Sequence, residues 1–157
     1  FWRQLGFQSM HIGAKRDKAS GTHNILMVRS QHPALNKVKQ HFKQQLPHSL
    51  METLTDLPPG LVIDLLAENA TSTASDATLQ AVQAYAKAQR PYESVSQALW
   101  QWTIDNPQAL QQTNETEQAV WLDKVLRKHD WQTVAKRHRL AGRKAIETLL
   151  QQTLQTD

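Results

Sequence analysis

The sequence predicts an α+β fold that is mainly α: a short β-hairpin near the N-terminus followed by an α-helical bundle. Two apolar segments within the first thirty residues, QSMHIG and HNILMV, flank a polar loop, which is typical of a hairpin. After residue 32, apolar residues recur at helical spacing in successive segments. Proline, glycine or small polar residues separate these segments, and no period of about 20–50 residues repeats, so a solenoid is not expected.

Residues 1–7, FWRQLGF, resemble the last turn of a helix that ends at Gly6. A two-stranded hairpin is at best marginally stable in water by itself. We therefore expect residues 1–31 to be the C-terminal end of a longer domain, and residues 32–157 to form a separate helical domain.

The helical domain divides at its helix-breaking residues. The predicted helices span residues 34–45, 61–66, 76–89, 94–105, 115–128, 131–138 and 143–154. Pro47 either ends the first of them or kinks it into residues 49–54, and residues 61–66 have a strand as the alternative. Residues 71–75 read as a polar loop, after which Ser75 or Asp76 caps the next helix. Asp130 is placed to cap the helix at 131.

The charge is divided into blocks along the chain. The formal net charge of +4 contains a net +7 in residues 1–43, −8 in residues 44–123, +7 in residues 124–144 and −2 in residues 145–157. Two basic blocks make a candidate phosphate-binding surface if folding brings them together, and a solvated helical surface is the simpler alternative. The chain has no cysteine, which excludes disulfides and thiolate metal sites.

Neither a membrane span nor a metal site is expected. No apolar run approaches the roughly 20 residues of a membrane-spanning helix, and the histidines show no metal-ligand spacing. These features favour a cytoplasmic location. The phosphate-binding motif G-x-x-x-x-G-K-[ST] is also missing, so we expect no bound ATP on this chain.

A specific motif lies in the first thirty residues. Its positions are Gly6, Phe7, Gly13, Arg16, Asp17, Ser20 and Gly21. A weaker match lies near the C-terminus, at Leu140, Gly142, Arg143 and Lys144. The pattern F-[YW]-x-x-x-G-F resembles the end of the fourth helix of the GNAT acetyltransferase fold. The longer pattern, with R-D-x-x-S-G, resembles the bacterial tRNA(Met) cytidine acetyltransferase family.

This resemblance implies a function for the whole protein. Residues 1–31 would be a helix end and a β-hairpin remnant of the GNAT sheet, and residues 32–157 a tRNA-binding tail. The full-length enzyme would transfer acetyl from acetyl-CoA to N4 of a cytidine in the anticodon of tRNA(Met), with ATP used by a helicase module. The fragment itself would be inactive and would bind neither acetyl-CoA nor ATP, because the GNAT pyrophosphate turn is missing too.

The hairpin loop is the first candidate for contacts with tRNA. By resemblance it borders the acceptor-substrate side of the GNAT cleft, where Lys15, Arg16 and Lys18 can meet phosphates. The alternative is a solvated loop in which Asp17 pairs with its basic neighbours. His23 is placed to act as a base for the cytidine amine, but a hydrogen-bonded structural histidine is the favoured interpretation, and the catalytic residue stays unassigned.

The first two residues are aromatic. Many GNAT enzymes place a tyrosine where Trp2 stands, and that tyrosine protonates the departing thiolate of CoA. An indole N–H does not titrate in water, so Trp2 does not fill this role. Phe1 and Trp2 are instead expected to lie in the vicinity of acetyl-CoA.

The second candidate is the basic segment 124–144. Its expected tRNA-binding residues flank the turn between the last two helices: Lys136, Arg137, Arg139, Arg143 and Lys144. Cations at a helix N-terminus oppose the helix dipole, a local conflict that a phosphate would relieve. Two rivals remain: a helix-turn-helix-like module that binds DNA or another protein and has no catalytic role, and a structural brace without a binding role. The sequence does not predict the oligomeric state.

Overall fold

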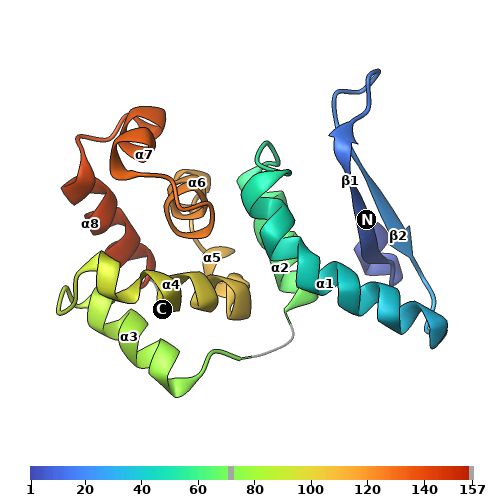
Figure 1. Ribbon diagram of the computed structural model, residues 1–157, viewed down its shortest axis with the longest axis horizontal. Helices are drawn as coiled ribbons and strands as arrows, with labels where there is room; N and C mark the ends of the chain where they lie inside the picture. The colour runs from blue at the N-terminus through green and yellow to red at the C-terminus, as the bar shows by residue number, and fades with distance from the viewer. Residues whose placement is uncertain (71–72, 156–157) are drawn as a thin grey trace. The chain divides into compact units, whose positions relative to one another are not determined.

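The computed structural model describes residues 1–70 and 73–155 and shows two compact units (Figure 1), Phe1–Asp56 and Leu57–Asp157. Within the described residues, helices predominate and one antiparallel pair of strands forms the sheet, which confirms the predicted α+β, mainly α class. Residues 71 and 72 of the predicted polar loop lie outside the described residues. The two basic blocks belong to different units.

The first unit begins with a turn and a hairpin. A 3₁₀ turn, η1 (Trp2–Leu5), ends at Gly6, whose φ of 82° is the left-handed conformation that glycine adopts without strain. Strands β1 (Gln8–Arg16) and β2 (His23–Val28) then pair in antiparallel fashion, with Gln8 opposite Val28. The predicted helix end and both predicted strands are confirmed.

Helix α1 (Ala34–Glu52) completes the first unit and packs against β1. Of the two alternatives predicted at Pro47, the helix does not end near residue 45 but continues past Pro47 into the predicted segment 49–54. A proline in a helix interior lacks the N–H that would bond the preceding turn. Burial of Leu46 and Leu50, at 1% and 0% exposure, offsets this cost. The hairpin therefore belongs to the same compact unit as α1. The division of the chain into a GNAT remnant, residues 1–31, and a tail, residues 32–157, stays a prediction.

The second unit is helical. Its elements are α2 (Pro59–Asn69), α3 (Asp76–Ala86), α4 (Tyr92–Asp105), α5 (Pro107–Leu110), α6 (Glu115–Trp121), the π-helix η2 (Leu122–Leu126), α7 (Trp131–His138) and α8 (Arg143–Thr153). Residues 61–66 are helical, as predicted, and not a strand. The last two helices begin at the predicted residues, 131 and 143. At the start of α7 the Asp130 carboxylate accepts a hydrogen bond from the Thr133 N–H, as predicted for a cap.

Three details of this unit differ from the prediction. Helix α3 ends at Ala86 and not at residue 89, because Ala88 takes a φ of 54° and leaves the helical path. Helix α5 was not predicted. The helix predicted over residues 115–128 changes at Leu122 into one turn of π-helix, a form that often occurs at functional sites.

The core of the second unit surrounds Trp121, which is fully buried. Its indole Nε1 donates a hydrogen bond of 2.9 Å to the Thr103 hydroxyl, and its ring lies 5.4 Å from that of Trp102. The polar edge of the indole thus has a partner inside an apolar core, as buried tryptophans require. Helices α7 and α8 contact each other, and α8 also contacts α3 and α6, so this core supports the segment that carries the second basic block.

Candidate nucleic-acid interface

The hairpin loop is a closed turn built around Asp17. Its carboxylate accepts hydrogen bonds from the backbone N–H groups of Ala19 and Ser20 and from the Ser20 hydroxyl. The bonds to Ser20 and Ala19 hold the pKa of Asp17 below its ordinary value. Gly21 closes the turn with a φ of 68°. The motif positions Asp17, Ser20 and Gly21 therefore shape the loop, and Asp17 does not pair with its basic neighbours.

Arg16 and His23 converge on one carboxylate, that of Asp56. The Arg16 Nε donates to Asp56 at 2.6 Å, and the His23 Nε2 lies 2.9 Å from the same carboxylate. Burial alone would raise the pKa of Asp56, but the bonds from His23 and Arg16 lower it. The other ring nitrogen of His23 lies 2.8 Å from the Gly13 carbonyl oxygen. Both ring nitrogens of His23 thus have polar partners within the first unit, the arrangement expected of a structural histidine.

The loop leaves two of its three predicted cations unpaired. Lys15 and Lys18 are exposed, and neither has an ion-pair partner among the described residues. Phe1 and Trp2 are also exposed, at 81% and 56%, and Trp2 stands edge-on between Phe1 and Phe7. The role of these two aromatic residues near acetyl-CoA stays a prediction.

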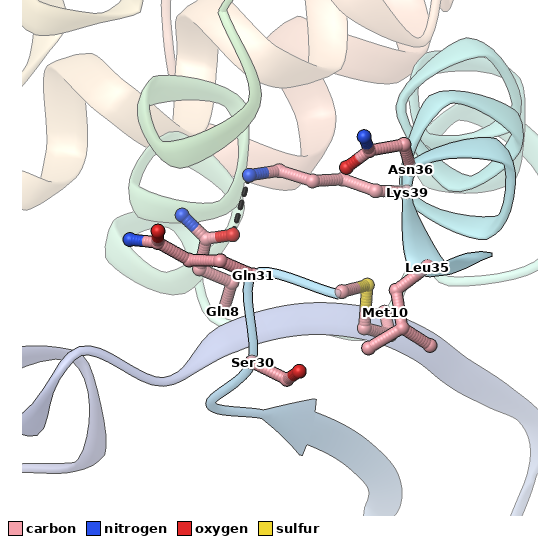
Figure 2. A pocket seen from close by; sticks show the side chains of 7 residues that line it. All are labelled: Gln8, Met10, Ser30, Gln31, Leu35, Asn36 and Lys39. Carbon is pink, nitrogen blue, oxygen red and sulfur yellow. Dashed lines mark hydrogen bonds between the residues drawn. The ribbon is translucent and has the colours of Figure 1, made fainter. Parts of the chain in front are cut away.

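A hollow of about 210 Å³ lies between the hairpin and α1 (Figure 2). Its residues are Gln8, Met10, Ser30, Gln31, Leu35, Asn36 and Lys39. The Lys39 amine donates a hydrogen bond to the Gln8 side-chain oxygen, as the dashed line in Figure 2 shows. Three carboxamides and one amine thus surround an apolar floor, which offers both hydrogen-bond donors and acceptors.

The second basic block is organised by Asp123, an acid in η2 that is 3% exposed. Its carboxylate accepts hydrogen bonds from Arg127 at 2.9 Å, Arg137 at 3.0 Å and His138 at 2.7 Å. Burial alone would raise the pKa of Asp123, but the bonds from these three side chains hold it below its ordinary value. Asp123 therefore fixes the last turn of α7 to η2 and neutralises part of the block.

Arg143 is also held by acids. Its guanidinium contacts Glu93 at 2.8 Å and Glu147 at 3.2 Å, and it lies 4.6 Å above the ring of Trp131. The predicted conflict between Arg143 and the dipole of α8 is thus relieved inside the chain, without a phosphate. Lys124 lies 4.1 Å from the centroid of the same tryptophan ring. Trp131 is therefore a packing platform for two cations.

Three of the predicted cations of the block face solvent. Lys136, Arg139 and Lys144 are exposed, and their side chains have no ion-pair partner among the described residues. They surround the turn between α7 and α8, where Arg139 takes a φ of 55°. Of the five residues predicted here, the structure leaves these three available to an anion, and it places Arg137 and Arg143 in ion pairs.

Two features of this surface were not predicted from the sequence: the buried acid Asp123 and the acidic partners of Arg143. Asp123 lies in the middle of a segment that reads as an ordinary amphipathic helix, and nothing local marks it as a buried acid. The partners of Arg143 come from α4 and from its own helix, and Glu93 is 50 residues away in sequence. The spacing of apolar residues along the chain carries no information about contacts of this range.

No helix among the described residues is long and apolar enough to cross a membrane, and no cluster of three or more histidine or acidic residues is arranged to hold a metal ion there. No family model matches the chain.

Comparison with known proteins gives a consistent result. The chain is 28% identical to tRNA(Met) cytidine acetyltransferase TmcA of Vibrio cholerae over 94% of its length, and 28% identical to the protein of that name from Nitrosococcus halophilus over 98%. The corresponding protein of Methanopyrus kandleri is 27% identical over 86% of the chain. The chain spans only 20%, 22% and 17% of these relatives. The similarity confirms the resemblance predicted from the sequence.

Proposed function

We propose that this chain, which is similar along most of its length to tRNA(Met) cytidine acetyltransferases, holds RNA for such an enzyme. The whole enzyme would transfer acetyl from acetyl-CoA to N4 of a cytidine in the anticodon of tRNA(Met), with ATP used by a separate helicase module. The chain would contribute the binding and positioning of tRNA. Because it spans about a fifth of its relatives, both the reaction and the partner are proposals for this protein.

One observation carries the proposal. Lys136, Arg139 and Lys144 surround the turn between α7 and α8 and have no acidic partner in the described chain, although the neighbouring Arg137 and Arg143 do. Cations without an ion-pair partner attract the phosphates of a nucleic acid without first having to break an ion pair. The ion-paired arginines instead hold the turn in place, and their predicted contacts with tRNA stay predictions.

The hairpin loop offers a second contact. Lys15 and Lys18 are exposed on a turn that Asp17 keeps closed, while Arg16 is occupied by Asp56. A loop with a fixed backbone loses little conformational entropy on binding, which favours affinity. We propose that this loop meets tRNA independently of the basic turn of the second unit.

Duplex DNA is the alternative ligand, since α7, a turn and α8 follow in the order of a helix-turn-helix motif. A recognition helix needs exposed polar side chains that reach base edges along its first turns. In α8, Arg143 is held by two acids and the Thr148 hydroxyl bonds to the Lys144 carbonyl. RNA, which proteins hold largely through shape and phosphates, therefore fits this surface better.

Binding of the 157-residue chain to elongator tRNA(Met) and to duplex DNA of equal charge, across a salt series, tests the proposal. The double variant Arg139→Glu/Lys144→Glu should weaken tRNA binding and reduce the magnitude of the salt slope by about 2, one for each lost phosphate contact. Lys37→Glu/Lys87→Glu is the matched control, since both lysines are exposed and lie outside the proposed surface. Equal loss in both variants, or a preference for the duplex, would contradict the proposal.

A further inference from the structure

A second hollow, of about 260 Å³, lies beside the π-helix. It is lined by Tyr92, Ser96 and Gln97 of α4, by Lys124 and Val125 of η2, and by Lys128. No acidic side chain lines it. Two lysines, a hydroxyl and a carboxamide therefore surround a space that contains no negative charge of its own.

Lys124 is the unusual member of this set, because it is buried without a direct ion pair. It is 7% exposed, and no carboxylate of the described chain lies within ion-pairing distance. The Lys124 amine donates to the His129 carbonyl at 2.8 Å and lies 5.0 Å from the centroid of the Tyr92 ring. Burial is the main cause that lowers its pKa. Asp130 and Glu93 offset part of the cost of burying this charge from beyond ion-pairing distance, and a bound anion would offset more of it.

Lys128 adds a second cation at an unusual backbone position. It is exposed and its φ is 60°, a left-handed conformation in which a glycine is unstrained and a lysine is not. The Lys128 amine lies 5.7 Å from the ring centroid of Trp100. The strained backbone places a long cationic side chain where the chain leaves η2, at the rim of the hollow.

Ser96 and Gln97 complete the donor set. Their side chains have no hydrogen-bond partner among the described residues, whereas the neighbouring Ser94 hydroxyl donates to the Pro91 carbonyl. A serine hydroxyl and a glutamine amide donate hydrogen bonds to the oxygens of a phosphate, and lysine supplies the charge.

We propose that this hollow binds one phosphate group of an RNA backbone, with Lys128, Ser96 and Gln97 as its direct donors. Lys124 supplies positive charge beneath them. The inference rests on the proposed function and adds to it a specific phosphate site, separate from the turn that carries Arg139 and Lys144.

The test uses the 157-residue chain and inorganic phosphate as the probe. In NMR titrations, phosphate should shift the backbone resonances of Ser96, Gln97 and Lys128 and the indole resonance of Trp100. Lys128→Gly removes the cation and relieves the backbone strain together, so the variant should stay folded and bind phosphate about tenfold more weakly. Lys87→Ala, which removes another exposed lysine of the same unit, should leave the titration unchanged.

Shifts spread evenly over the exposed lysines and arginines, or a Lys128→Gly variant that binds phosphate as tightly as the parent, would overturn the inference. The same variants titrated with tRNA separate it from the proposed function. Loss of tRNA affinity in Arg139→Glu/Lys144→Glu but not in Lys128→Gly would reject the phosphate site and leave the proposed function standing. A localised phosphate site in a chain that does not bind tRNA would reject the proposed function instead.

Discussion

Replacing Asp123 by alanine should destabilise the chain strongly. The Asp123 carboxylate is 3% exposed and accepts three hydrogen bonds, all from basic side chains. The side chain of Arg127 is itself only 7% exposed, so the substitution removes a counter-charge from a buried guanidinium. Loss of one partner of a buried ion pair costs about 3–5 kcal/mol.

For a chain of this size, that cost corresponds to a fall in melting temperature of roughly 6–20 °C, which calorimetry or circular dichroism measures directly. Asp76→Asn is the matched control, because Asp76 is an exposed carboxylate in the first turn of α3 and its loss should cost under about 1 kcal/mol. Asp123→Asn keeps the shape and removes the charge. If Asp123→Ala melts within 3 °C of the parent, roughly half the smallest expected shift, the carboxylate does not anchor α7 and the reasoning fails.

The remaining predictions concern acid, alkali and two further positions. The pKa of Asp123 is lower in the folded than in the unfolded chain, so its contribution to stability is complete above the unfolded pKa of about 4. That contribution should disappear as the pH falls through the folded pKa. Acid unfolding of the parent and of Asp123→Asn, compared side by side, checks this. Burial raises the pKa of Tyr92 to about 12 and that of Tyr85 further, so the absorbance of ionised tyrosine should be weak at pH 10, where a free tyrosine is half ionised. The contribution of the two neutral tyrosines to stability is present below pH 10 and is lost as the pH rises through their folded pKa values. Asp56→Ala should speed amide hydrogen exchange in the hairpin loop, and unchanged exchange would show that Arg16 and His23 do not brace it. Arg139→Gly should raise the free energy of unfolding by about 1 kcal/mol while weakening tRNA binding, and a fall in both would contradict the strain argument.

The elements that the sequence predicted well are those with local signals. Helices α7 and α8 begin where Asp130 and Gly142 indicate, because a cap or a turn is decided by residues within one turn of the chain. At the end of α1 the sequence left two alternatives open, because the outcome depends on packing as well as on the local signal. Pro47 is a strong local breaker, but buried apolar side chains on both sides of it outweigh the lost hydrogen bond.

The candidate site was predictable in composition but not in detail. The sequence identified the basic block, and its exposed members Lys136, Arg139 and Lys144 were among the predicted residues. It did not separate them from Arg143, whose acid partner Glu93 lies on another helix. The availability of a cation depends on such distant contacts, so charge clustering alone overestimates the binding surface.

Backbone strain gives a further way to separate the two kinds of cation. The non-glycine residues with positive φ in the described chain are Ala88, Lys128 and Arg139, and each follows a helical segment. Glycine is the common choice there because it avoids a cost of about 1–2 kcal/mol. An exposed cation near a helix C-terminus regains about 0.3–1 kcal/mol from the dipole, which offsets only part of that cost. At two of the three positions the chain thus carries a long cationic side chain on a strained backbone, and these cations border the proposed phosphate hollow and the proposed RNA-binding turn. If these strained cations are kept because they bind RNA, Lys128→Gly and Arg139→Gly should each raise the free energy of unfolding and lower the affinity for RNA. Ala88→Gly should raise the free energy of unfolding and leave binding unchanged.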